Sequence, residues 1–336
     1  MPKTIFCLMG PTASGKTALA CELVKRFPFE IISVDSAMIY REMDIGTAKP
    51  SPEELAIAPH HLIDIIDPPE SYSAAQFCED AVKLVEEIYS RQRFPLMVGG
   101  TMMYFHALQQ GLSPLPHADE ELRASLSQQA NLHGWAYLHE QLAQVDPQSA
   151  LRIHPNDAQR IQRALEVYHL TGKPLSSFWS EQKENQNYHF VNLVLFPQDR
   201  NWLHARIAAR FEHMLEQGFV YEVAQLLQKW HLTLTCPAIR CVGYRQVVDY
   251  LAGDYDYETL RQKGIAATRQ LAKRQLTWLR SWTNAMVFAC ENPASHGEII
   301  ALVSEILDNM ADSSKQKAIT TPVKKPTHKK MIRGEK

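Results

Sequence analysis

The sequence predicts an α/β fold in which a parallel sheet is covered by helices, with a small all-helical insertion domain. Short buried apolar runs alternate with helical patterns through residues 4–110, and such alternation with short connections is typical of parallel sheets. Residues 119–171 then show only helical spacing, and a further apolar run follows them. The chain has 336 residues, 45% of them hydrophobic and 21% charged, which is an ordinary globular composition.

The first part of the chain supplies most of the expected sheet. Apolar runs predict strands over Ile5–Met9, Ile31–Val34, Leu62–Ile66 and Pro95–Val98. Apolar side chains at helical spacing predict a helix over Thr17–Arg26. A second helix is predicted to begin at Ser73, because Gln76 follows it in the capping-box pattern.

The pattern changes at two prolines, Pro114 and Pro116, which interrupt both helix and strand. Residues 119–171 follow a helical pattern, and the last helix of this stretch is expected to be capped by Asn156 or Asp157. Later elements are predicted as a strand over Val191–Phe196, helices over Trp202–Gln217 and Tyr221–Trp230, a long helix up to Trp282, and a strand over Met286–Ala289. The predicted domains are a core over 1–116 and 191–311, a helical insertion over 117–190, and a disordered Lys- and Pro-rich tail over 312–336.

Composition excludes several classes of protein. No apolar run approaches the length of a membrane span, so no membrane partner is expected. Six cysteines without a C-x-x-C pair or a secretion signal predict a cytoplasmic protein without disulfides. Residues 315–336 hold eight Lys or Arg and one Glu, whereas the rest of the chain holds 27 basic and 36 acidic residues. Nucleic acid would therefore bind through local patches, and the tail either adds nonspecific RNA affinity or is a solvated end.

A phosphate-binding loop is predicted between the first strand and the first helix. The segment fits G-x-x-x-x-G-K-[ST] and consists of Gly10, Pro11, Thr12, Ala13, Ser14, Gly15, Lys16 and Thr17. The glycines let backbone N–H groups converge, Lys16 adds a point charge, and Thr17 can hold Mg²⁺. The segment predicts a P-loop NTPase-like sheet that binds a polyphosphate or a pyrophosphate, without specifying ATP.

Asp35 directly follows the second predicted strand. Ligands of open α/β sheets bind at the carboxyl ends of strands, so Asp35 should face the ligand of the phosphate loop. Three roles stay open for it: a metal ligand, a general base, or a helix cap together with Ser36. A P-loop hydrolase would carry an acidic residue on a later strand, but the strand at Pro95–Val98 ends in Gly-Gly-Thr101, which weakens the NTPase interpretation.

Several segments together resemble one family, the tRNA dimethylallyltransferases or isopentenyltransferases. They are GPTASGKT (10–17), VDSAMIYREMDIGTAKP (34–50), MVGGTMMY (97–104), HPNDAQRIQRALEV (154–167), RCVGYRQ (240–246) and TRQLAKRQLTWLR (268–280). Many NTPases share the loop, whereas the combination is specific. The resemblance covers residues 3–290, and the tail beyond residue 312 lies outside it.

The resemblance implies a tRNA prenyltransferase. Its reaction would move a dimethylallyl group from dimethylallyl diphosphate to N6 of the adenosine on the 3′ side of the anticodon, releasing diphosphate. The implied partners are tRNA and dimethylallyl diphosphate, the expected cofactor is Mg²⁺, and a monomer is expected. The resemblance also makes Asp35 the general base and places Lys16, Thr101 and Arg210 around the diphosphate.

The resemblance further implies a set of tRNA-binding residues. They are Asp35, Ser36, Ala37, Met38, Thr101, Arg123, Gln159, Arg160, Ile161, Gln162, Arg163, Arg240, Cys241, Val242, Gly243, Tyr244 and Arg245. The residues themselves add Arg269, Lys273 and Arg274, because residues 259–290 contain no Asp or Glu. Trp278 and Trp282 are interleaved with these cations, and this mixture suits phosphate contacts and base stacking. The alternative is a basic amphipathic helix with core tryptophans.

Some assignments stay open at this point. Arg206 and Arg210 stand four positions apart and share a helix face. The resemblance favours Arg210 as the arginine at the diphosphate, and the alternative for both is a solvated basic face. No Cys/His spacing supports a zinc site, so His60 and His61 are interpreted as structural or surface residues. Two other functions would use the same loop: a small-molecule kinase with a helical lid, and a non-catalytic RNA-binding module.

Overall fold

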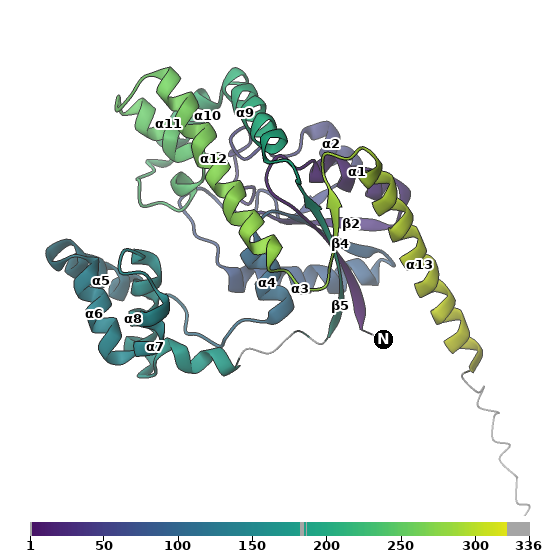
Figure 1. Ribbon diagram of the computed structural model, residues 1–336, viewed down its shortest axis with the longest axis horizontal. Helices are drawn as coiled ribbons and strands as arrows, with labels where there is room; N and C mark the ends of the chain where they lie inside the picture. Colours follow the sequence, from purple (N-terminus) through teal and green to yellow (C-terminus); the bar gives the residue numbers. More distant parts are fainter. Residues whose placement is uncertain (1, 182–184, 186, 321–336) are drawn as a thin grey trace, which may run out of the picture.

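The computed structural model describes residues 2–181, 185 and 187–320. In this part of the chain six strands form one parallel sheet, which lies at the centre of Figure 1. The strands are β1 (Lys3–Met9), β2 (Phe29–Val34), β3 (His60–His61), β4 (Phe94–Gly99), β5 (Tyr188–Phe196) and β6 (Ala285–Ala289). Their order across the sheet is β3-β2-β4-β1-β5-β6. The predicted parallel α/β fold is confirmed.

Helices cover both faces of the sheet. One face carries α3 (Ala74–Ser90), α4 (Met102–Gln110) and the end of α12 (Tyr257–Arg280), and the other carries α1 (Lys16–Arg26) and α13 (Ala294–Thr320), with α2 (Pro52–Ile57) nearby. In β1, Ile5, Cys7 and Met9 belong to the first hydrophobic cluster, whereas Phe6 and Leu8 belong to the second. Because both faces are buried, the strands have continuous apolar sequences rather than alternating ones.

The helix that follows β3 begins where the sequence predicts. The Ser73 hydroxyl accepts the Gln76 N–H at 3.2 Å, and Gln76 Oε1 accepts the Ser73 N–H at 2.8 Å. This reciprocal pair is the predicted capping box, and it satisfies two N–H groups that the first turn of α3 would otherwise leave unpaired.

A separate group of helices occupies the predicted insertion. It comprises α5 (Glu120–His133), α6 (Trp135–Val145), α7 (Pro147–Arg152), α8 (Ala158–Thr171) and a 3-10 helix η1 (Leu175–Glu181). These elements share a hydrophobic cluster within residues 122–175, and α5 to α8 lie apart from the sheet in Figure 1. Asp157 caps α8, since its carboxylate accepts the Arg160 N–H at 3.2 Å. The domain limits at residues 117 and 190 stay a prediction, although β5 already begins at Tyr188.

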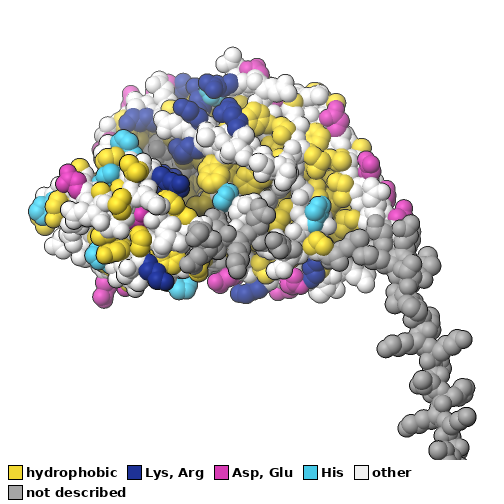
Figure 2. All heavy atoms as spheres, turned by 60° about the horizontal axis from the view of Figure 1, so that its bottom comes forward, with side chains coloured by type: hydrophobic (Ala, Val, Ile, Leu, Met, Phe, Trp, Pro, Cys, Tyr) yellow, Lys and Arg dark blue, Asp and Glu magenta, His cyan; other side chains and the backbone are white. Residues whose placement is uncertain are grey.

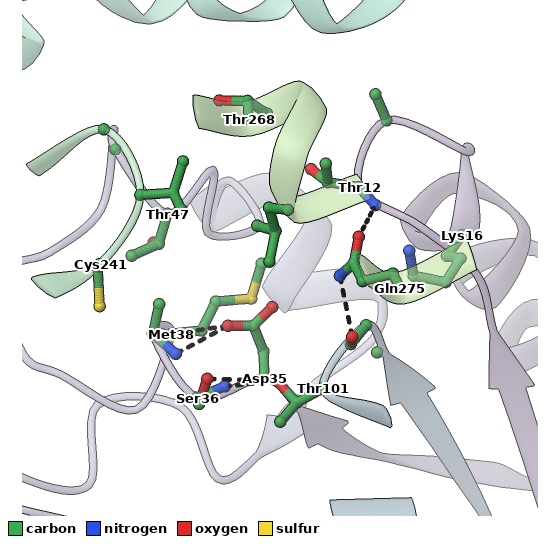
Figure 3. A pocket seen from close by; sticks show the side chains of 18 of the residues that line it. Thr12, Lys16, Asp35, Ser36, Met38, Thr47, Thr101, Cys241, Thr268 and Gln275 are labelled. Atoms are coloured by element: carbon green, nitrogen blue, oxygen red, sulfur yellow. Dashed lines mark hydrogen bonds between the residues drawn. The ribbon is translucent and has the colours of Figure 1, made fainter. Parts of the chain in front are cut away.

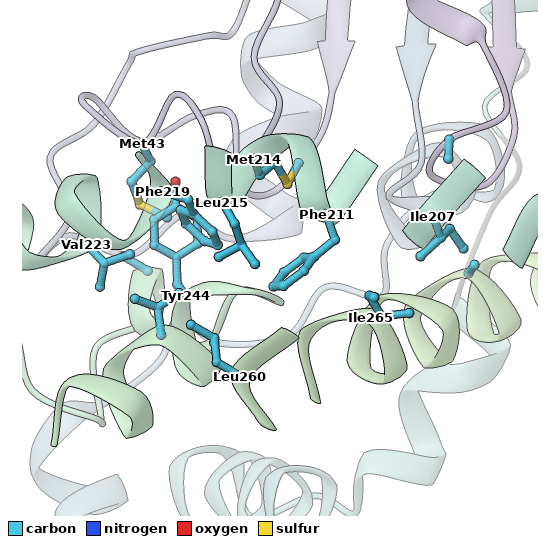
Figure 4. Close-up of a cluster of buried hydrophobic side chains, with 14 of the residues drawn as sticks. Met43, Ile207, Phe211, Met214, Leu215, Phe219, Val223, Tyr244, Leu260 and Ile265 are labelled. Carbon is cyan, nitrogen blue, oxygen red and sulfur yellow. The ribbon is translucent and has the colours of Figure 1, made fainter. Parts of the chain in front are cut away.

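A fourth hydrophobic cluster lies beyond the carboxyl ends of the strands. It is built by α9 (Arg200–Glu216), α10 (Phe219–Trp230), η2 (Ala238–Arg240), α11 (Tyr244–Leu251) and α12. Phe211 and Tyr244 each pack edge-on against Phe219, with ring centroids 6.3 and 5.0 Å apart (Figure 4). Met43, from the loop after β2, is buried in the same cluster. The cluster therefore fixes the loop that follows Asp35 against α9 to α12.

Two sequence predictions about secondary structure are wrong. Leu62–Ile66 is not a strand, because Leu62 and Asp64 have φ values of 62° and 55°, and the chain turns after the two-residue β3. The Ile65 N–H donates to the Ile39 carbonyl at 2.8 Å, and the apolar side chains of Leu62, Ile65 and Ile66 pack in hydrophobic clusters without forming a strand. The predicted disordered tail is helical up to Thr320, where α13 ends. The remainder of that prediction, residues 321–336, lies outside the described residues.

Candidate functional site

The carboxyl ends of β1, β2 and β4 open into a cavity of about 860 Å³. The residues that line it include the phosphate loop from Thr12 to Thr17, segments 35–38, 99–104 and 240–244, Arg206 and Arg210 from α9, and Arg274, Gln275 and Trp278 from α12. Figure 3 shows this cavity, with the Asp35 and Lys16 side chains approaching it from different segments. The volume lies in the range of ligand sites. Segments far apart in the sequence therefore meet where an α/β sheet binds its ligand.

The phosphate loop has the backbone conformation that an anion site needs. Ala13 and Gly15 adopt left-handed φ values of 64° and 94°, which turn the chain sharply before α1. The Lys16 ammonium folds back over the loop and donates to the carbonyls of Gly10 and Pro11 at 2.8 and 2.6 Å. These contacts keep the charge at the centre of the loop, next to the amino end of α1.

Burial makes the Lys16 charge costly. Burial, followed by the charge of Arg210, lowers the pKa of Lys16 to about 7, against the opposing effect of Asp35. Burial also lowers the pKa of Arg210, and Asp35 again opposes the shift. Two desolvated cations thus lie near the Asp35 carboxylate, and an anion bound between them would relieve their repulsion.

Asp35 is held by its own chain. Its Oδ1 accepts the N–H groups of Ala37 and Met38 at 2.8 and 3.3 Å, and Figure 3 shows the carboxylate pointing into the cavity. No helix follows, so the predicted helix cap is in fact a cap of the turn at residues 36–39. For Oδ2 no hydrogen bond is recorded within the described chain, which leaves one oxygen able to accept a proton.

Thr101 ties the end of β4 to the segment that carries Asp35. Its hydroxyl oxygen accepts the Ser36 N–H at 3.0 Å, and its own N–H donates to the Val34 carbonyl at 3.1 Å. The predicted neighbourhood of Asp35, Ser36 and Thr101 at one sheet edge is therefore present in the structure.

The two arginines of α9 have different surroundings. Arg206 Nε donates to the Ala13 carbonyl at 2.8 Å, and its guanidinium lies over the Trp202 ring, 4.9 Å from the centroid. Arg210 lines the same cavity, where its charge interacts with those of Lys16 and Asp35, and the described part of the chain offers its guanidinium no hydrogen bond or ion pair. Arg206 thus supports the phosphate loop, whereas the N–H groups of Arg210 are available to donate hydrogen bonds to a ligand.

Sequence reasoning missed Gln275. This buried side chain lies between two segments of the site: Oε1 accepts the Thr12 N–H at 2.9 Å, and Nε2 donates to the Gly100 carbonyl at 2.9 Å (Figure 3). The available signal was a polar residue on the apolar stripe of a helix, among Ala272, Leu276 and Leu279.

The donor set bears on the expected Mg²⁺. Thr17 lines the cavity beside Lys16, and no cluster of three or more His, Cys, Asp or Glu side chains occurs among the described residues. Mg²⁺ ordinarily takes few protein oxygens and completes its shell with phosphate oxygens and water. The residues present therefore fit an ion that arrives with a diphosphate and fit poorly a metal held by protein alone.

Cations and an aromatic ring surround the cavity mouth. Figure 2 shows a hollowed face of the molecule with Lys and Arg side chains gathered around it. On α12, Arg269, Lys273 and Arg274 are exposed, and Trp278 keeps 40% of its surface exposed while it lines the cavity. Trp282 is instead partly buried against the sheet cluster, so only one of the two tryptophans matches the core alternative.

The side chains of segment 240–245 also differ in their exposure. Arg240 is exposed at the cavity, and Cys241, Val242 and Gly243 line it. Tyr244 is fully buried, and its hydroxyl donates to Glu222 at 2.6 Å. Tyr244 packs into the fourth cluster and also lines the cavity, so a tRNA contact at this residue stays a prediction. Arg245 is exposed and pairs with Asp249 at 3.0 Å.

Segment 159–163 follows the helical period of α8. Gln159 and Arg160 are exposed, whereas Ile161 is fully buried in the cluster of the helical group. Gln162 Nε2 donates to the Arg123 carbonyl at 2.9 Å, and Arg163 Nη2 donates to the Pro116 carbonyl at 2.7 Å. The predicted contact by the Ile161 side chain is wrong for lack of exposure.

Arg123 and Arg163 meet at an internal carboxylate. Arg123 donates to both oxygens of Glu166 at 2.8 and 3.1 Å, and Arg163 donates to Oε2 at 2.5 Å. Glu166 is fully buried, so the two arginines stabilise a charge inside the helical group. His60 and His61 bond the Ala58 carbonyl and the Glu30 carboxylate at 2.6 and 3.0 Å, and His60 also lines the cavity.

Comparisons with known proteins point to one family. The family model described as IPP transferase matches residues 38–282, and a model described as Isopentenyl transferase matches residues 3–66. The tRNA dimethylallyltransferase of Legionella pneumophila (strain Corby) is 63% identical over 309 residues, covering 92% of this chain and 99% of that protein. The tRNA dimethylallyltransferase of Coxiella burnetii (strain RSA 493 / Nine Mile phase I) is 57% identical over 305 residues, covering 90% and 96%.

Two solved structures extend the comparison. The full-length tRNA isopentenylpyrophosphate transferase from Bacillus halodurans superposes with a TM-score of 0.68 at 36% identity, covering 93% of this chain and 99% of that chain. A eukaryotic dimethylallyltransferase acting on tRNA superposes with a TM-score of 0.78 at 25% identity, covering 91% and 80%. No described helix is long and apolar enough to cross a membrane.

Proposed function

The chain belongs to the IPP transferase family, and from this premise we propose how its site acts. It is a tRNA-modifying enzyme that transfers a dimethylallyl group to tRNA. We propose dimethylallyl diphosphate as the donor and N6 of the adenosine beside the anticodon, on its 3′ side, as the acceptor. The observation that supports this most is a single cavity that joins a phosphate loop, a carboxylate with one uncommitted oxygen, and an exposed basic rim.

The diphosphate would lie against the phosphate loop and α9. The loop amides, Lys16 and Arg210 offer positive charge that the described protein leaves without an acidic hydrogen-bond partner. Charge on the leaving diphosphate grows as the C1–O bond breaks, so these groups stabilise the transition state more than the bound substrate. Thr101 and Arg206 hold the site in shape through their contacts to Ser36 and Ala13.

Mg²⁺ fits this arrangement through the Thr17 hydroxyl and the oxygens of the diphosphate. It would supply further neutralisation of the departing charge. The remaining steps are performed by side chains of this chain.

The transfer itself requires one bond to form and one to break. N6 of the adenine attacks C1 of the allyl group, the C1–O bond breaks, and the electron pair leaves with the diphosphate. The N6 proton passes to Asp35, whose Oδ1 is held by two backbone amides while Oδ2 is without a recorded partner in the described chain. A base positioned in this way contributes about 100-fold or more to such a step.

The adenine must enter a cavity beneath the surface, so it is unstacked from its neighbours and flipped. An anticodon loop is single-stranded, which reduces the cost of this movement. Arg269, Lys273 and Arg274 lie exposed on the helix beside the mouth, where they are suited to phosphate contacts, and Trp278 is suited to stacking. We propose that the protein acts as a monomer in the cytoplasm, a reducing compartment in which its six free cysteines would stay reduced.

Mass analysis of nucleosides tests this proposal. The protein is incubated with tRNA, dimethylallyl diphosphate and Mg²⁺ without ATP, and an adenosine heavier by one dimethylallyl group is expected. ATP-dependent phosphorylation of a small acceptor, without any prenylated nucleoside, would instead support a kinase. Binding of tRNA with neither product would support a non-catalytic module.

A further inference from the structure

The buried amide of Gln275 is the one polar side chain of α12 that reaches the phosphate loop among the recorded contacts of the described residues. It accepts the Thr12 N–H and donates to the Gly100 carbonyl, both at 2.9 Å. Three segments meet there: the loop after β1, the end of β4 next to Thr101, and α12 itself. Neither the phosphate nor the acceptor chemistry described above uses this group.

The surroundings of Gln275 are shaped for an amide. A Cβ added at Gly100 would lie 2.4 Å from Gln275 Nε2, so a glycine is needed for the amide to reach the carbonyl. When carboxyl groups are ionised, only an amide supplies one acceptor and one donor at the same end of a side chain of this length. A carboxylate could accept from Thr12 but would face the Gly100 oxygen, and a methionine would leave both backbone groups unpaired.

We propose that Gln275 is a positioning residue, which holds the phosphate loop in register with the Gly-Gly-Thr end of β4 and links both to the RNA-facing helix. This inference rests on the proposed function. The Thr12 N–H is committed to Gln275, so the diphosphate is bound by the other loop amides and Lys16. Because Arg274 and Trp278 lie on the same helix, the phosphate loop and the RNA-facing side chains share one rigid support.

The test compares Gln275→Met with Gln270→Met, a control at an exposed glutamine of the same helix. We measure KM for dimethylallyl diphosphate, the Kd of inorganic pyrophosphate with Mg²⁺, and the Kd of tRNA. Loss of two buried hydrogen bonds should raise the KM and the pyrophosphate Kd of Gln275→Met at least tenfold. The tRNA Kd should change less than twofold, and Gln270→Met should match the wild type in its KM and pyrophosphate Kd.

A second variant keeps the inference testable if Gln275→Met does not fold. Gln275→Glu retains the acceptor for Thr12, and its carboxyl can donate to Gly100 only when protonated. Its pyrophosphate Kd should therefore approach the wild-type value as the pH falls from 8 to 6, which a purely structural role would not produce.

The outcomes separate the inference from the proposed function. If the wild type transfers the dimethylallyl group and folded Gln275→Met keeps its KM within twofold, the inference is wrong and the function stands. Parallel loss of tRNA and pyrophosphate affinity would also overturn it, because α12 as a whole would have moved. If the wild type transfers nothing, the proposed function fails, and the pyrophosphate Kd values still decide the role of Gln275.

Discussion

Two charge clusters of this protein each place two cations near one carboxylate, and they differ in how those cations are paired. In the helical group, buried Glu166 accepts hydrogen bonds from Arg123, Arg163 and the Asp119 N–H, so its charge is matched inside the protein. At the sheet edge, Lys16 and Arg210 line one cavity near the Asp35 carboxylate, and neither has a recorded ion pair in the described chain. A cluster whose cations are paired stabilises the fold, whereas desolvated cations without an ion pair mark a site that is complete only with an anion.

Removing the carboxylate of the cavity should have the largest effect. Asp35→Asn keeps the size of the side chain and an oxygen that can accept the Ala37 and Met38 amides. It lacks the base, so we expect the turnover number to fall about 1000-fold. Single-turnover prenyl transfer measures this, with tRNA affinity and melting temperature as controls that should not move. Turnover within tenfold of the wild type would contradict the base assignment.

Removing the cation of the loop should have the next largest effect. Lys16→Met should lower kcat/KM for dimethylallyl diphosphate about 100-fold, because the departing charge loses its central partner. The effect on tRNA affinity should be small. A variant that lost tRNA binding and kept the KM for the diphosphate would show that the loop does not hold the donor.

The same lysine predicts a pH dependence with a definite sign. Its pKa of about 7 lies below the ordinary value, so the ammonium loses its proton as pH rises through 7 in the free protein. A bound diphosphate favours the charged form and raises this pKa, so binding above pH 7 should take up a proton and weaken as the pH rises. Calorimetry of pyrophosphate binding in buffers of different ionisation enthalpy measures the uptake. Lys16→Met should remove the protein's share of it, leaving only the share of pyrophosphate itself.

Disrupting the Glu166 cluster should lower the stability of the fold and leave ligand binding unaffected. Glu166→Gln leaves Arg123 and Arg163 without their carboxylate. Since both arginines are partly exposed, we expect a loss of about 2 kcal/mol in the unfolding free energy rather than the larger cost of a fully buried pair. Denaturant unfolding measures this, and the pyrophosphate Kd should remain unchanged. A change in pyrophosphate affinity without a loss of stability would invert the comparison.

Sequence patterns located the residues of the cavity but not the buried polar residues that hold distant segments together. The loop motif and the rule for strand ends placed Lys16, Asp35 and Thr101 together because both depend on local chain geometry. Gln275 and Glu166 act through partners brought to them by folding, and Thr12 and Gln275 stand 263 positions apart. The same limit explains Ile161: a motif shows that a segment matters, while burial decides which of its side chains can reach a ligand.

The smallest expected effect is on the salt dependence of tRNA binding, and it should differ between a surface arginine with an ion pair and one without. Arg274 is exposed beside the cavity and has no recorded ion pair in the described chain, whereas Arg160 already pairs with Asp157 at 2.5 Å. Arg274→Ala should reduce the slope of log Kd for tRNA against log salt by about one, because one phosphate contact is lost. Arg160→Ala should change the slope less, since part of its charge is neutralised before the RNA arrives. Equal changes in the two slopes would mean that the Arg160–Asp157 ion pair opens when tRNA binds. A cation paired on the surface would then remain available to a ligand, unlike the arginines paired with buried Glu166.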